Sequence, residues 1–188
     1  MLLFEKPGKE NTQKTLEIAF AKARELQTKL IVSTTGGDNA REALQMAESL
    51  GQTKGLIVVG HAWDFKTHEG GNKMAPDIYA ALRERQVPIV FASHLLSGAE
   101  RAFSTRFSGA YPAEIMAHTL RMLGQGMKVC VECSVMALDA GCIEKPGPVV
   151  AVGGTGRGAD TACVLTPAHA NDILSTKIHE ILCKPSLY

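Results

Sequence analysis

The sequence lacks a long apolar segment and lacks a strong excess of charge of one sign. No uninterrupted apolar run reaches the roughly 18 residues that a membrane-spanning helix needs. The first residues also lack the positively charged region and long apolar stretch of a secretory signal. Lysine and arginine number 20 against 19 aspartates and glutamates, and neither sign forms a long run. We therefore expect a cytoplasmic protein that binds neither nucleic acid nor a membrane.

The sequence also lacks a framework of cysteines and a set of metal ligands. Five cysteines, an odd number, are scattered over 188 residues, a length that can bury its own core without disulfides. Cys130 and Cys133 form a CxxC pair, but a zinc site would need a second pair, which the sequence does not contain. Neither His61 nor His94 lies at metal-ligand spacing from another histidine. We expect packed thiols in a reducing compartment and no metal site.

What the sequence does contain is a regular alternation of short apolar runs and longer segments with helical periodicity, punctuated by Gly and Pro, without repeats or linkers. This alternation is typical of an α/β domain, and we expect one such domain over residues 1–188. Strands are predicted at residues 30–34, 56–60, 89–92 and 149–152. Helix starts are predicted at Asn11 and Asp38 as capping residues, at a capping box formed by Ser97 and Glu100, and at Pro76 and Pro112 as first helical residues.

Residues 128–135 fit two patterns. Apolar residues alternate there as in a strand, yet Val129, Cys133, Met136 and Ala140 also recur at helical spacing before Gly141. The length of the pattern favours a helix. Residues 162–165 and 178–183 are predicted to be further strands near an edge of the sheet, in part antiparallel. The expected fold is thus a mostly parallel sheet with an antiparallel edge.

Several polar segments follow the predicted strands directly. In an open parallel sheet the loops that leave the strands gather at one edge, which is where ligands bind. We therefore expect the first helix start and the loops after four strands to lie together at this edge, with the polar residues that they carry. The segments concerned are residues 6–12, 33–39, 61–64, His94 with Ser97, and 153–160.

The loop after the first predicted strand combines hydroxyl groups, glycines and a helix start. Backbone N–H groups and the helix dipole at such a place can hold a phosphate without a fixed cation. The alternative is an ordinary turn with an aspartate cap, because Ser, Thr and Gly are also common turn residues. The residues that we assign to a phosphate site are Ser33, Thr34, Thr35, Gly36, Gly37 and Asp38.

The loop after the fourth predicted strand is rich in glycine and carries one arginine. It is not a dinucleotide fingerprint, because a strand-like segment follows it in place of a helix, and it lacks the ending of a P-loop. Glycines allow the backbone to approach a ligand closely, and an arginine can bind an anion. We interpret this loop as a ligand contact, against the alternative of a flexible hairpin loop. Its residues are Gly153, Gly154, Thr155, Gly156, Arg157 and Gly158.

Hydrolytic chemistry has little support, because no serine lies in a GxSxG motif and no cysteine has the setting of a nucleophile. Glu132 is unusual as a charge within an apolar pattern. It marks either an inward-facing carboxylate at the site or a solvated helix face.

A set of motifs occurs in one order along the chain, namely Lys6-Pro7-Gly8 with Glu10-Asn11-Thr12, His94-Leu95-Leu96-Ser97-Gly98 with Glu100-Arg101, Lys128-Val129-Cys130-Val131-Glu132, Ala151-Val152-Gly153-Gly154 with Arg157-Gly158-Ala159-Asp160-Thr161-Ala162, and Pro167-Ala168-His169 with Asn171. With these motifs the sequence resembles a family of small, mostly uncharacterised prokaryotic proteins that are similar to the C-terminal α/β domain of pyruvate kinase. The resemblance covers nearly the whole chain and implies a three-layer αβα sandwich without pyruvate kinase activity. It also favours a helix over residues 127–140.

The resemblance implies a ligand as well. In pyruvate kinase the corresponding domain binds an effector sugar phosphate with a Ser/Thr/Gly loop and a Gly-rich loop, which residues 34–38 and 153–158 resemble. Free-standing members are associated with flavin mononucleotide (FMN). The basic residue of the pyruvate kinase phosphate loop is absent here, where Gly37 and Asp38 stand instead, and this weakens the case for a sugar bisphosphate.

Three functions are therefore compared. The first is an FMN-binding protein and, if it is an enzyme, a flavin-dependent oxidoreductase, with further ligand contacts from Asn11, Thr12 and His61. The second is a non-catalytic sensor or regulatory domain for a phosphorylated metabolite. The third is a structural subunit of a larger complex. The sequence leaves the substrate and the oligomeric state open, a homo-oligomer included.

Overall fold

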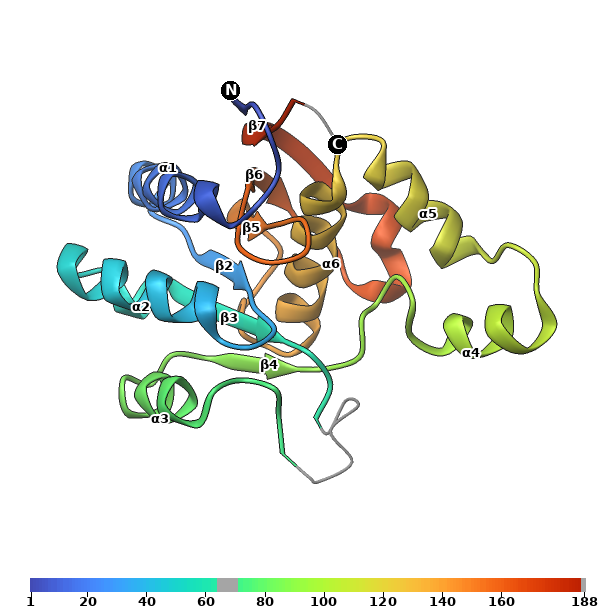
Figure 1. The fold of residues 1–188 in the computed structure, drawn as a ribbon, viewed down its shortest axis with the longest axis horizontal. Coiled ribbons are helices and arrows are strands. Elements are labelled where there is room, and N and C mark those ends of the chain that lie inside the picture. The colour runs from blue at the N-terminus through green and yellow to red at the C-terminus, as the bar shows by residue number, and fades with distance from the viewer. Residues whose placement is uncertain (64–70, 187–188) are drawn as a thin grey trace.

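The protein folds around one mixed sheet with helices on both faces, as a computed structural model shows for residues 1–63 and 71–186 (Figure 1). Only β6 runs antiparallel to its neighbours, and the other adjacent strands pair in parallel. The α/β class and the mostly parallel sheet are thereby confirmed. In spatial order the strands of the described residues are β1 (Leu2–Phe4), β7 (Lys177–Pro185), β6 (Thr161–Thr166), β5 (Val149–Gly153), β2 (Leu30–Ser33), β3 (Leu56–Gly60) and β4 (Ile89–Phe91).

The helices divide between the two faces of the sheet. Figure 1 shows α1 (Thr12–Glu25), α2 (Asp38–Leu50) and α3 (Pro76–Glu84) along one face. On the other face α6 (Gln125–Asp139) packs against the sheet, α5 (Pro112–Arg121) packs on α6, and α4 (Gly98–Phe107) contacts α5. This gives helix, sheet and helix layers. Three short 3₁₀ helices, Lys9–Asn11, Thr53–Gly55 and Ala170–Ser175, complete the described elements.

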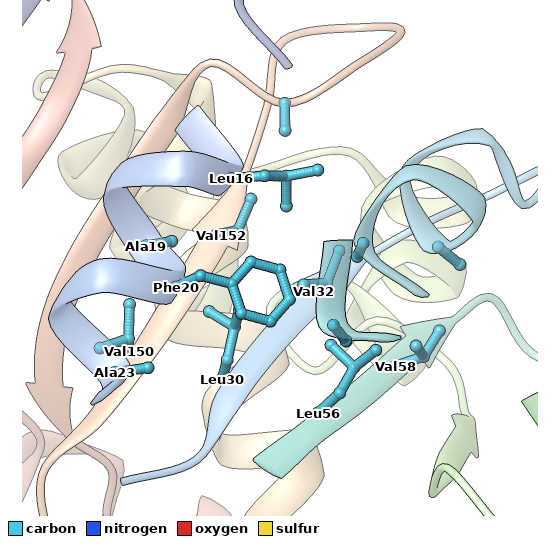
Figure 2. Close-up of a cluster of buried hydrophobic side chains, with 14 of the residues drawn as sticks. Leu16, Ala19, Phe20, Ala23, Leu30, Val32, Leu56, Val58, Val150 and Val152 are labelled. Atoms are coloured by element: carbon cyan, nitrogen blue, oxygen red, sulfur yellow. The ribbon is translucent and has the colours of Figure 1, made fainter. Parts of the chain in front are cut away.

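Two hydrophobic clusters separate these layers. Along β2, Leu30 and Val32 face the cluster beneath α1, α2 and α3, whereas Ile31 faces the cluster beneath α6. Phe20 of α1 extends its ring toward Leu30 and Val32, as Figure 2 shows. A strand covered on both faces needs apolar residues at successive positions, which is why the central strands read as continuous apolar runs.

The ambiguous segment is a helix, α6, as the length of its pattern and the resemblance both predict. Close packing places α6 directly on the sheet. A Cβ atom at Gly126 would lie 2.1 Å from Oγ1 of Thr161, and one at Gly153 would lie 2.4 Å from the carbonyl oxygen of Gly126. The start of α6 therefore lies against the end of β5.

The predicted capping interactions are wrong, although the predicted helix starts are close to the observed ones. Asn11 is at the N-cap of α1, yet its side chain donates to the carbonyl oxygen of Lys6 at 2.8 Å. Asp38 is the first residue of α2 instead of its cap. Ser97 makes no capping hydrogen bond, and Glu100 accepts a hydrogen bond from the backbone N–H of Ala113 at 2.8 Å. Asn11 and Glu100 thus bond to other partners than the pattern predicts, and Asp38 is shifted by one residue.

The antiparallel pairing of β6 is confirmed, but the edge of the sheet differs from the prediction. Strand β7 pairs with β1, which forms this edge of the sheet. The sequence pattern did not reveal this short N-terminal strand. Among the described residues, no helix combines the length and the apolar character needed to cross a membrane.

Candidate functional site

The loops that leave the parallel strands enclose a cavity of about 600 Å³ at the carboxyl edge of the sheet. This volume is within the range of about 300–1,000 Å³ that is usual for small-molecule sites. The walls come from the segments after β2, β3, β4 and β5, together with one face of α6. The residues that line it are Ser33, Thr34, Thr35, Gly36, Asp38, Asn39, Val59, Gly60, His61, His94, Gln125, Val129, Glu132, Cys133, Met136, Gly154, Gly156, Arg157 and Gly158.

Hydrogen bonds hold the loop before α2 in a tight turn. The backbone N–H of Gly37 donates to Oγ1 of Thr34 at 3.1 Å, and the amide of Asn39 donates to the carbonyl oxygen of Ser33 at 3.0 Å. The backbone N–H of Thr34 donates to the carbonyl oxygen of Val59 at 2.9 Å, which joins the turn to β3. The first N–H groups of a helix have no partner within that helix, so the start of α2 presents donors beside the cavity.

The two glycines of this loop have different roles. Gly37 has a φ of 105°, and a Cβ atom there would lie 2.5 Å from Cγ2 of Ile78, so the fold itself requires glycine. Gly36 lines the cavity, and a Cβ atom there would meet no described atom within 4 Å. The backbone at Gly36 is therefore open to a ligand.

The glycine-rich loop is anchored by a buried carboxylate. Asp160 is fully buried, and it accepts hydrogen bonds from the backbone N–H groups of Gly8 and Thr155 at 3.3 and 3.1 Å and from the hydroxyl of Thr161 at 2.8 Å. These bonds tie the end of the loop to the segment before α1. The rest of the loop, with the exposed side chain of Arg157, is left to face the cavity.

Thr12 is a second anchor of the same loop. Its buried Oγ1 accepts a hydrogen bond from the backbone N–H of Ala159 at 3.0 Å and donates to the carbonyl oxygen of Lys9 at 2.7 Å. A Cβ atom at Gly158 would lie 2.4 Å from Cα of Lys9, so the loop and the start of α1 are in direct contact. Thr12 thus holds the glycine-rich loop against the start of α1.

Thr12→Val keeps the shape of this side chain but removes both hydrogen bonds. We expect it to lower the free energy of unfolding by about 1–3 kcal/mol, because the buried backbone N–H of Ala159 loses its acceptor. Urea denaturation measures this, with Thr12→Ser, which retains the hydroxyl, as the control. A valine variant as stable as the wild type would show that these hydrogen bonds do not stabilise the fold.

The structure brings together most, but not all, of the sequence-predicted site residues. Ten of them line the cavity, namely Ser33, Thr34, Thr35, Gly36, Asp38, His61, Gly154, Gly156, Arg157 and Gly158. Within the described part of the chain, five do not line it: Asn11, Thr12, Gly37, Gly153 and Thr155. Those five lie in the same loops or at the start of α1, where they support the walls. Asp64, at the end of the predicted segment 61–64, is outside the described residues.

One wall of the cavity comes from α6 and was missed by sequence reasoning, apart from Glu132. Gln125, Val129, Cys133 and Met136 line the cavity together with Glu132. Glu132 is inward-facing, and the alternative of a solvated helix face is wrong, since only 1% of its side chain is exposed. A charge within an apolar helical pattern was the available signal for this wall.

Glu132 is the centre of a buried polar cluster. Its Oε1 accepts a hydrogen bond from the backbone N–H of Leu96 at 2.8 Å, and its Oε2 forms an ion pair with the buried ammonium of Lys128, one helical turn away. Nδ1 of His94 lies 3.5 Å from the same Oε2. The imidazole rings of His94 and His61 stack with their centroids 4.3 Å apart and an interplanar angle of 17°.

Both histidines are less basic than usual. Burial is the main cause for His61, followed by repulsion from His94 in its protonated form and from Lys73, and together they lower the pKa of His61 to about 4. Burial also lowers the pKa of His94, against the opposing effect of the Glu132 carboxylate. The two stacked rings are therefore uncharged at neutral pH.

A pH dependence of stability follows from these shifts. In the unfolded chain a histidine has a pKa of about 6.5, so between there and about pH 4 the unfolded state binds protons that folded His61 does not. We expect the free energy of unfolding to fall as the pH is lowered through this window, and to be unaffected by His61 above it. Denaturation curves at several pH values measure this, and His61→Gln is expected to flatten the dependence. An unchanged slope in that variant would contradict the assignment.

Thiol and metal chemistry have little support in this cavity. Burial raises the pKa of the Cys133 thiol well above its ordinary value, which keeps it protonated and weakly nucleophilic. Within residues 1–63 and 71–186, no three His, Cys, Asp or Glu side chains are grouped as ligands for a metal ion.

No protein-family model matches the sequence. The lining of the cavity offers backbone donors, hydroxyls and an arginine, which suit an anion, and also two uncharged imidazoles, of which His94 lies beside a carboxylate.

Proposed function

We propose that the protein binds a small phosphorylated ligand in this cavity, and that the ligand is FMN. The observation that carries the proposal is the convergence of two loops, one before α2 and one after β5, on a single cavity at the carboxyl edge of the parallel strands. Ligands of open α/β sheets bind at this edge.

The electrostatics of the cavity favour one phosphate group over two. Arg157 is the only arginine or lysine among the described residues that line it, Asp38 adds a carboxylate, and the charge of Glu132 is balanced by Lys128. One phosphate can be held by the N–H groups at the start of α2 and by Arg157. A second phosphate would find no second lysine or arginine among these lining residues. A monophosphate such as FMN agrees with this balance better than a sugar bisphosphate.

The proposal includes membership in the family that resembles the C-terminal domain of pyruvate kinase. Support for this comes from the three-layer arrangement and from the motifs at residues 6–12, 94–101 and 151–162, which lie close to the cavity or support its walls. The glycine-rich loop and the loop before α2 are then the counterparts of the two effector-binding loops of pyruvate kinase. The chain's own residues would bind and orient the ligand, and a bound flavin would supply redox chemistry.

The first experiment is the visible absorption spectrum of the purified, desalted protein, followed by titration of the colourless protein with FMN. Trp63 is the only tryptophan, and it packs edge to face against Phe91 with the two ring centroids 5.4 Å apart. It lies two residues after His61, which lines the cavity, so we expect its fluorescence to report binding. A yellow protein or saturable quenching supports the proposal. Absence of both would contradict FMN and favour a sensor of another phosphorylated metabolite.

Arg157→Ala is expected to weaken FMN binding by about 1–3 kcal/mol, because a charge-assisted hydrogen bond to the phosphate is lost. The side chain is exposed, so the midpoint of thermal unfolding is expected to stay unchanged. Arg106→Ala, which removes an exposed arginine from α4, is the matched control. Equal affinity of the two variants would leave Arg157 outside the site.

A further inference from the structure

The buried ion pair beside His94 costs the fold free energy. Lys128 and Glu132 are both buried, and burying a pair of charges costs free energy that their attraction only partly offsets. A structural role alone does not require the charges, because a neutral amide could accept the hydrogen bond from Leu96 equally well. A buried carboxylate with a charge partner, in the wall of a cavity, is typical of functional sites.

The position of the carboxylate relative to His94 is informative. Oε2 of Glu132 lies 3.5 Å from Nδ1 of His94, and 36% of the histidine side chain is exposed, where it lines the cavity. A carboxylate beside Nδ1 favours the tautomer that carries its proton on Nδ1. Nε2 then keeps a lone pair that can accept a proton.

We propose that His94 is the acid–base residue of this cavity and that Glu132 is its positioning residue. The inference rests on the proposed function in one respect, namely that the cavity holds a phosphorylated ligand. That ligand would carry, beyond its phosphate, a group that gains or loses a proton while it is bound.

The proton balance of the step is simple. A proton leaves an X–H bond of the ligand for Nε2 of His94, and the bonding electron pair stays on the ligand. The product is an imidazolium beside the Glu132 carboxylate, and return of the proton reverses the step. At rest His94 is uncharged, since burial and Lys128 lower its pKa more than Glu132 raises it. His61, stacked on the ring, is also uncharged and adds no resting charge.

The first test needs no ligand. ¹⁵N NMR spectra report the tautomer and the pKa of each histidine, with His94→Gln to assign the signal and exposed His118 as the internal reference. We expect the Nδ1–H tautomer in the wild type, and a further drop of the His94 pKa with partial loss of this tautomer in Glu132→Gln. If Glu132→Gln does not fold, Lys128→Met/Glu132→Gln removes both charges and keeps the acceptor for Leu96. A proton on Nε2 in the wild type, or no change of tautomer in the variants, would overturn the proposal.

The second test asks whether His94 faces the ligand. Diethyl pyrocarbonate acylates uncharged imidazole, and mass spectrometry resolves the rate at each histidine. With FMN at about ten times its Kd, roughly one tenth of the sites stay free, so we expect acylation of His94 to slow about tenfold while His118 is unaffected. FMN that binds without protecting His94 would overturn the proposal. FMN that does not bind would instead refute the proposed function, and the NMR result alone would then decide on His94.

Discussion

Gly36→Val is expected to abolish binding of the phosphorylated ligand while leaving the protein folded. The φ of Gly36 lies outside the left-handed region, and a side chain there would meet no described atom, so the fold accepts valine. The added methyl groups would occupy space beside the N–H groups of the loop before α2. Loss of two charge-assisted hydrogen bonds at about 1.5–3 kcal/mol each would weaken FMN binding by about a hundredfold or more.

Gly98→Val is the matched control for this prediction. A Cβ atom at Gly98 also meets nothing within 4 Å, its φ is ordinary, and the residue does not line the cavity. Fluorescence titration with FMN and thermal unfolding should be measured for both variants. Unchanged affinity in Gly36→Val would remove the loop from the site, and unfolding of that variant alone would show that Gly36 has a structural role.

Glu132→Ala is expected to destabilise the protein by about 3–5 kcal/mol, because the buried ammonium of Lys128 is left without its counter-charge. The backbone N–H of Leu96 loses its acceptor in the same variant. Urea denaturation measures the loss.

A double variant separates the cost of the stranded charge from the value of the pair. Lys128→Met/Glu132→Gln removes both charges and keeps an acceptor for Leu96, so it should recover most of the lost stability. If the double variant is as unstable as Glu132→Ala, the ion pair itself stabilises the fold and the argument that it is retained for function fails.

The central strands of the fold were predictable because each is marked by a pattern within a short stretch of sequence. Short apolar runs between glycines and prolines define the central strands, and the prediction of residues 30–34 differs by one residue from the observed Leu30–Ser33. The predicted end of the fourth strand, residue 152, likewise lies one residue from the observed Gly153. Edge strand β1 was missed because its three residues carry no pattern that distinguishes them from a loop.

The details of the site depend on partners that are distant in the sequence. Thr12 supports the glycine-rich loop across 147 residues of chain, which no local pattern encodes. Glu100 has the spacing of a capping box, yet α5 provides a better donor in the backbone of Ala113. The carboxyl-edge rule could bring the loops together because it follows from topology alone, whereas the wall formed by α6 depends on how that helix crosses the sheet.

A comparison of FMN with riboflavin shows whether the cavity binds a phosphate, since the two ligands differ only in the phosphate group. Titration of the desalted protein, followed by Trp63 fluorescence, gives both affinities under one set of conditions. We expect saturable binding of FMN and binding of riboflavin that is weaker by about a hundredfold, because charge-assisted contacts to the phosphate are lost. Equal affinities, or no binding of FMN, would contradict a phosphate site at this edge of the sheet.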